Sequence, residues 1–167
     1  VQGGGRQANS HTDSTYVTVS GKPTIELLCG SVTDGNSYGD TPPVDDAHIH
    51  ITGSPTIGNV YGGGWDIWAK PDYPSTGTTS ISIDGNEGLD IGGVYGGGFR
   101  GTVGVSQSTM TVTISISGEG SIDSVYGGGK GGEDPVYNFN AKEGENPRGP
   151  GASDITGPAK VIGDVSI

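Results

Sequence analysis

The chain has 167 residues, of which only 30% are hydrophobic and 34 are glycine, and its formal net charge at pH 7 is −11. This length fits one domain, and the composition excludes a large compact core and a run of about 20 apolar residues that would cross a membrane. The eight Lys and Arg residues are scattered, which argues against nucleic acid as a partner, because phosphate contacts need clustered positive charge. No signal peptide is visible, and we expect Val1 to be a processed start.

The sequence Val-Tyr-Gly-Gly-Gly occurs three times, at 60–64, 94–98 and 125–129, with spacings of 34 and 31 residues. Self-similarity at such a period is typical of repeat proteins, in which each unit covers the apolar face of the next. An Ile stands three residues before each Val, and degraded copies of the pattern appear at 25–30 and 155–165. The repeat favours an ordered chain over the disorder that low hydrophobicity and high net charge would otherwise predict.

Alternating apolar and polar residues precede each motif and predict a first set of strands, whereas frequent Gly, Pro and β-branched residues nearly exclude helix. We expect this first set at Ser14–Ser20, Ala47–Thr52, Thr78–Asp84 and Thr109–Ser117, with a weaker strand at Asp154–Thr156. A second set runs through Ile57–Tyr61, Ile91–Tyr95 and Ile122–Tyr126 and should stack the three Tyr side chains. Alternation in the first set should turn one aliphatic row inward: Val17, Val19, Ile49, Ile51, Ile81, Ile83, Ile114 and Ile116.

These patterns predict an all-β fold, a parallel β-solenoid in the form of a right-handed β-helix of about five coils, with long loops on one side. In a single domain over 1–167, we expect the repeats near 14–46, 47–77, 78–108, 109–151 and 152–167, with 1–13 completing the period. The excursions Asp34–Asp46, Trp65–Gly77 and Glu133–Ser153 are rich in Pro, Gly, Asp and Asn, as loops are. The two ends of the chain are expected in phase, with Val1 and Val165 equivalent to the Val of the motif.

The segment 51–64, Ile-Thr-Gly-Ser-Pro-Thr-Ile-Gly-Asn-Val-Tyr-Gly-Gly-Gly, resembles the tandem repeats of large bacterial surface proteins. Those repeats read roughly Ile-Ser-Gly-Gly-x-Ile-Gly-x-Val-Tyr-Gly-Gly-Gly and look like parallel β-solenoids of adhesin type. The resemblance covers about 16–132, with a remnant at 155–165, and carries no catalytic residue. It implies an extracellular or cell-surface protein of a prokaryote. Because the full motif occurs only three times, a polymer subunit is favoured over a long single-chain stalk.

Parallel coils leave unpaired backbone donors and acceptors at both ends, and neither end offers a helix or a Pro-blocked cap. A head-to-tail contact between such ends repeats without closing and builds a filament. We therefore expect copies of the chain as partners and a self-assembling, extracellular structural protein as the function. Enzymatic function is not expected, because acidic and Arg residues are dispersed rather than gathered in one groove. The expected assembly interface comprises Val1, Gln2, Gly3, Val161, Ile162, Val165 and Ile167.

Three aromatic residues of the middle excursion, Trp65, Trp68 and Tyr73, support an alternative function. Exposed aromatic side chains stack on sugar rings or anchor a protein interface, although they can also fold back to cover their own loop. The alternative is therefore a cell-surface adhesin module that binds carbohydrate or a host protein through these aromatic loops.

Asp45, Asp46, His48 and His50 form the densest cluster of metal-ligating residue types. The two His residues are two apart on a predicted strand, so they point the same way and, with a carboxylate, would suit a metal ion. Two outward His residues on a solvated strand are the more common explanation. Asp84-Gly85-Asn86 is first of all a turn sequence, although its oxygen atoms also suit Ca²⁺. No other cofactor is expected, and the single Cys29, which replaces the motif Tyr, should be buried without a disulfide.

Overall fold

The computed structural model describes residues 1–4, 11–32, 44–65, 74–99, 102–104, 110–130 and 164–167. These residues form ten β-strands and no helix, so the all-β prediction is confirmed for them. In the same ranges, no helix has the length and hydrophobicity needed to cross a lipid bilayer. The weak strand predicted at Asp154–Thr156 lies outside the described residues.

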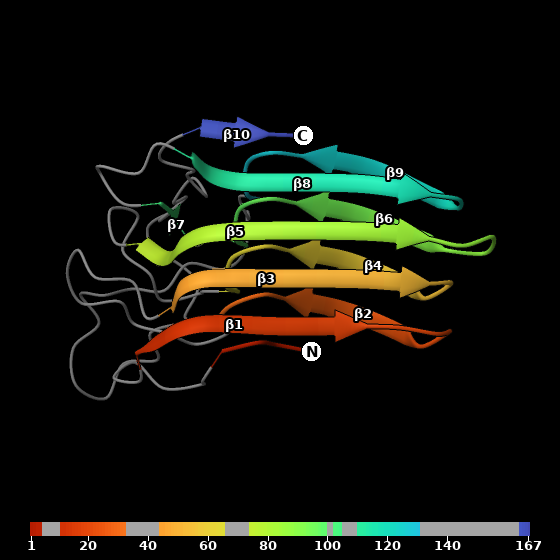
Figure 1. The fold of residues 1–167 in the computed structure, drawn as a ribbon, viewed down its shortest axis with the longest axis horizontal. Helices are drawn as coiled ribbons and strands as arrows, with labels where there is room; N and C mark the ends of the chain where they lie inside the picture. Colours follow the sequence, from red (N-terminus) through yellow and green to blue (C-terminus); the bar gives the residue numbers. More distant parts are fainter. Residues whose placement is uncertain (5–10, 33–43, 66–73, 100–101, 105–109, 131–163) are drawn as a thin grey trace, which may run out of the picture.

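The first sheet is parallel and contains the longer strands. Its order is β1 (Thr12–Val19), β3 (Val44–Gly53), β5 (Pro74–Gly85), β8 (Met110–Gly118) and β10 (Asp164–Ser166), as Figure 1 shows from bottom to top. The two-residue β7 (Thr102–Val103) pairs with the beginning of β5. Alternating Val, Ile, Thr and Ser residues suit strands with one buried face, which explains why these segments extend and pair.

The second sheet is also parallel and lies behind the first in Figure 1. Its order is β2 (Thr24–Cys29), β4 (Thr56–Tyr61), β6 (Asp90–Tyr95) and β9 (Ser121–Tyr126). The chain alternates between the sheets, and we call two consecutive strands that are joined by a short turn a strand pair. There are four strand pairs among the described residues, β1–β2, β3–β4, β5–β6 and β8–β9, and each is stacked on the one before it.

The short turns within the strand pairs are also stacked. Gly53 ends β3 with a φ of 85°, a left-handed conformation that favours glycine. Backbone N–H groups of one turn donate to carbonyl groups of the turn before it at 2.8 Å: Ser54 to Gly21, Asn86 to Gly53, and Glu119 to Gly85. The turn register therefore matches the strand register, in which Gly53 lies beside Gly85.

The core lies between the two sheets and is formed by their facing aliphatic rows. First-sheet residues such as Ile51 and Ile83 pack in one cluster with second-sheet residues such as Val60 and Val94, and each of these four is at most 1% exposed. The predicted inward row is therefore confirmed with one exception. Ile116 occupies the register position of Ile83 but is 44% exposed, because β8 is covered by another described strand only in its first part.

Four points of the strand prediction need correction. The strands β3 and β5 begin earlier than predicted, so 44–46 and 74–77 are strand rather than loop. The short strand β7 was missed, because two residues carry no periodicity. Val165 was placed among the motif valines of the second sheet, but it pairs with Val112 in the first sheet. Polar residues flank Val165 on both sides, so its local sequence fits the edge of either sheet.

Candidate functional site

A column of side chains runs through the last position of the second-sheet strands. Tyr61, Tyr95 and Tyr126 share one register position in β4, β6 and β9. The ring centroids lie 5.0 Å apart for Tyr61 and Tyr95 and 5.1 Å apart for Tyr95 and Tyr126, with nearly parallel planes. Cys29 holds the same position in β2 and is buried, as predicted. We call these four residues the tyrosine column.

In the sequence, a glycine follows each residue of the tyrosine column, because a side chain at that position would not fit. A Cβ on Gly30 would overlap the carbonyl oxygen of Gly62, and a Cβ on Gly62 would overlap that of Gly96. Buried threonines of the first sheet reach the same level. Thr15 Oγ1 donates to the Gly30 carbonyl at 2.6 Å, and Thr79 Oγ1 donates to the Gly96 carbonyl at 2.6 Å. The glycines thus permit close approach between strand pairs and between the sheets.

Exposed large hydrophobic side chains gather at the two ends of the stack. Among the described residues they are Val1 (64% exposed), Tyr16 (75%), Ile116 (44%), Tyr126 (51%) and Ile167 (71%). Val1 lies beside β2 and Tyr16 on β1. Ile116 lies on β8, Tyr126 on β9 and Ile167 directly after β10. None of the described residues of β3 to β6 is among them. We call the two ends the β1 edge and the β9 edge.

At the β1 edge, the segment Val1–Gly4 runs beside β2 and extends the second sheet. Gln2 forms a parallel bridge with Cys29. The Cys29 N–H donates to the Val1 carbonyl at 2.9 Å, and the Gly3 N–H donates to the Cys29 carbonyl at 3.0 Å. Three of the predicted assembly residues, Val1, Gln2 and Gly3, therefore lie at this edge, with Gln2 in the register of the tyrosine column.

At the β9 edge, β10 extends the first sheet but covers only part of β8. Val165 pairs with Val112 and Ser166 with Thr113, and the following residue, Ile167, is exposed. In the second sheet, β9 is the last described strand. Two of the predicted assembly residues, Val165 and Ile167, thus lie at this edge. The other two, Val161 and Ile162, lie outside the described residues.

Burial makes the covered part of the tyrosine column chemically inert. It raises the pKa of the Cys29 thiol to about 12, so the reactive thiolate is scarce at neutral pH. Burial also raises the pKa of Tyr61, and the neighbouring Tyr95 and Cys29 add to the shift. The column therefore stabilises the stack rather than supplying a nucleophile.

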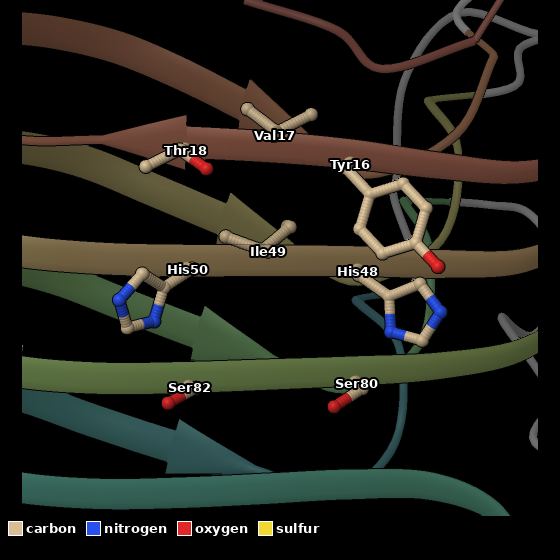
Figure 2. Close-up of a pocket in the computed structure, with 8 residues that line it drawn as sticks. All are labelled: Tyr16, Val17, Thr18, His48, Ile49, His50, Ser80 and Ser82. Atoms are coloured by element: carbon tan, nitrogen blue, oxygen red, sulfur yellow. The ribbon is translucent and has the colours of Figure 1, made fainter.

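The outer face of the first sheet carries a shallow depression of about 180 Å³. Figure 2 shows it between two columns of outward side chains that come from β1, β3 and β5. One column holds Tyr16, His48 and Ser80, and the other holds Thr18, His50 and Ser82. The Tyr16 and His48 rings are stacked, with centroids 4.7 Å apart and an interplanar angle of 11°. We call this feature the outer-face depression.

The predicted ligand-binding aromatic residues fall in two groups. Trp65 is half-buried and stacks on Phe99, with ring centroids 4.0 Å apart, while its ring meets Tyr61 edge-on. Trp68 and Tyr73 lie outside the described residues. Trp65 thus packs beside the tyrosine column, and ligand binding by the three residues stays a prediction.

The structure does not bring the four predicted metal-ligating residues into one group. Asp45 Oδ1 lies 3.1 Å from His11 Nε2, whereas Asp46 accepts a hydrogen bond from Thr78 at 2.5 Å. Among the described residues, the ligand atoms that lie within 4.8 Å of one another belong to His11, Asp13 and Asp45. His48 instead stacks on Tyr16, and His50 lies across the outer-face depression.

The predicted calcium turn also has other partners. Asp84 is the next-to-last residue of β5, and its Oδ1 accepts a hydrogen bond from Ser117 Oγ at 3.1 Å, while Asn86 follows the strand. Calcium binding there stays a prediction.

Three residues of these sites were not predicted: Tyr16, His11 and Asp13. Tyr16 was detectable from strand alternation, which places it on the face opposite to Val17 and Val19. His11 and Asp13 were not, because their proximity to Asp45 depends on the pairing of β1 with β3.

Comparisons of the chain with protein-family models, with curated proteins and with solved structures found no match.

Proposed function

We propose that the two sheets are faces of a right-handed parallel β-solenoid of about five coils, and that copies of this chain stack head to tail into an extracellular filament. The role is structural and non-enzymatic. The alternation of the chain between two parallel sheets and the stacked turns support the solenoid. The resemblance of 51–64 to repeats of bacterial surface proteins supports a location outside a prokaryotic cell.

One observation carries the proposal: equivalent residues are covered within the stack and uncovered at its edges. Tyr61 is 1% exposed and Tyr126 is 51% exposed at the same register position. An uncovered parallel strand presents unpaired backbone groups that a further strand can satisfy. A second copy would supply that strand with the same register, and a contact between unlike ends repeats without closing.

The segments at the two edges are complementary in position. The β1 edge has an additional segment in the second sheet, Val1–Gly4, whereas the β9 edge has an additional strand in the first sheet, β10. In the proposed stack, these two segments therefore extend different sheets at the junction between copies. The register then places Gln2 of the next copy over Tyr126, as Gln2 lies beside Cys29 within one chain.

Charge should control this assembly. Each chain carries a formal net charge of −11, so copies repel one another at low ionic strength. Salt shortens the range of that repulsion to about 8 Å at 0.15 M. We therefore expect filaments to form more readily as salt concentration rises, because hydrophobic and backbone contacts at the edges remain.

Electron microscopy of the purified chain tests the proposal, with two variants that carry the same added charge. Tyr126→Lys places an ammonium group on the β9 edge and should abolish filaments. Asn86→Lys places it on an exposed turn away from both edges and should leave them intact. Circular dichroism should show β-structure in both variants. Filaments that persist in Tyr126→Lys, or discrete rods for the unmodified chain at every salt concentration, would contradict the proposal.

A further inference from the structure

The outer-face depression owes its shape to the sizes of side chains in neighbouring strands. His48 and His50 project from β3 on the two sides of the depression, whereas β5 offers only Ser80 and Ser82 at the same register positions. Figure 2 shows the two imidazole rings with the open sheet surface between them. The hollow therefore follows from the strand register, which sets small serine side chains beside the larger histidine side chains.

One side of the depression is aromatic. Tyr16 is 75% exposed, and its ring is held nearly parallel to that of His48, at an interplanar angle of 11°. In a stacked pair each ring covers one face of the other, so the pair offers a free ring face to a ligand, with a hydroxyl group and ring nitrogen atoms at its edges. Such a surface suits a ligand that has a flat face of C–H groups and hydroxyl groups around it.

The polar groups of the depression select for a neutral ligand. The described residues that line it include no Lys, Arg, Asp or Glu that would pair with a charged ligand. The chain's net charge of −11 further disfavours an anionic ligand. The hydroxyl groups of Thr18, Ser80 and Ser82 both donate and accept, as the hydroxyl groups of a sugar do.

From these observations we propose that the outer-face depression binds a neutral sugar residue of an oligosaccharide or polysaccharide. A free ring face of the Tyr16–His48 pair packs against its C–H face, and His50 and the serine hydroxyl groups form hydrogen bonds with its hydroxyl groups. This site is distinct from the loop aromatic residues around Trp65. It also does not depend on filament formation, because all of its side chains belong to one chain.

Titrations followed by amide NMR shifts test the site on the full chain carrying Tyr126→Lys, so that assembly plays no part. The probes are cellohexaose, mannohexaose and chitohexaose, with trigalacturonate as the charged comparison. We expect at least one neutral hexasaccharide to bind and to shift amides of residues 16–18 and 48–50. Tyr16→Ala and His48→Ala should each weaken binding at least tenfold, whereas Tyr16→Phe, which keeps the ring, should stay within about threefold.

Thr113→Ala is the matched control, because Thr113 shares the outward column of Tyr16 and His48 but does not line the depression. Its binding should equal that of the parent chain. Failure of all three neutral sugars to bind, binding of trigalacturonate alone, or equal affinities for Tyr16→Ala and Thr113→Ala would overturn the site. The unmodified chain, kept unassembled at low salt, should give the same affinity, so this result is separate from success or failure of the filament proposal.

Discussion

The middle strand pairs and the β8–β9 pair have nearly the same sequence pattern but different burial. Ile51 and Ile83 are 0% and 1% exposed in the middle, whereas Ile116, in the same register, is 44% exposed. The difference does not come from the residue or its strand. It comes from the next strand pair in the stack, which covers Ile51 and Ile83 in the middle pairs. Burial in this fold is therefore supplied by stacking, as expected when each unit covers the apolar face of the next.

The largest expected effect compares these isoleucines directly. Ile51→Ala should lower the free energy of unfolding by about 2–5 kcal/mol, because it removes buried methyl groups and leaves a cavity. Ile116→Ala should lower it by less than about 1 kcal/mol in the monomer, because its side chain is already partly solvated. Urea unfolding of both variants measures the difference. Equal losses would show that burial does not depend on the neighbouring pair.

Two glycines of the motif allow the same comparison between the middle of the stack and its edge. Gly62→Ala should cost about 1–3 kcal/mol, because the new Cβ would overlap the Gly96 carbonyl and force adjacent strands apart. Gly128 lies at the β9 edge, where a Cβ would meet nothing within 4 Å. Gly128→Ala should therefore change the stability of the monomer by only about 0.5 kcal/mol. It should nevertheless weaken filament formation, because the proposed stacking covers this glycine with the next copy.

A pH titration of stability tests the buried part of the tyrosine column. The unfolded Cys29 thiol loses its proton near pH 9, whereas the folded thiol, with a pKa of about 12, keeps it. The folded chain thus binds more protons in this window, and stability must fall as pH rises through it, by up to about 1.4 kcal/mol per pH unit. The raised pKa of Tyr61 acts in the same direction at higher pH.

Urea unfolding at several pH values between 8 and 11 should therefore show a steeper decline for the parent chain than for Cys29→Ala. Below pH 8 the two curves should run in parallel, whatever their offset. Identical slopes above pH 9 would mean that Cys29 is not shielded from water in the folded chain.

The smallest expected effect concerns two buried threonines of β5. Thr79→Val should cost about 1 kcal/mol, because it removes the hydrogen bond to the Gly96 carbonyl. Thr76 is also buried, but its Oγ1 has no hydrogen-bond partner within the described part of the chain. Thr76→Val should therefore be neutral or stabilising. Thermal unfolding of the two variants checks the order, and a greater loss in Thr76→Val would contradict these hydrogen-bond assignments.

The sequence predicted the two strand sets, the buried isoleucine row and the stacked tyrosines, because each depends on a local period of two and a conserved spacing between motifs within the chain. It misplaced Val165, because a single apolar residue between polar neighbours fits either sheet and only pairing decides. The closeness of His11 and Asp45 likewise depends on strand register, which adjacent residues do not encode. The outer-face depression required the side-chain sizes on three neighbouring strands to be read together.

The axial rise per subunit, measured by cryo-electron microscopy of the filaments, tests the central claim most directly. Among the described residues, five strands follow one another along the first sheet, with β7 beside β5, and five segments, counting Val1–Gly4, follow one another along the second. Continuous stacking at about 4.8 Å per strand predicts a rise of about 24 Å, with strands perpendicular to the filament axis. A rise unrelated to five strand spacings, or contacts that leave the β1 and β9 edges uncovered, would contradict it.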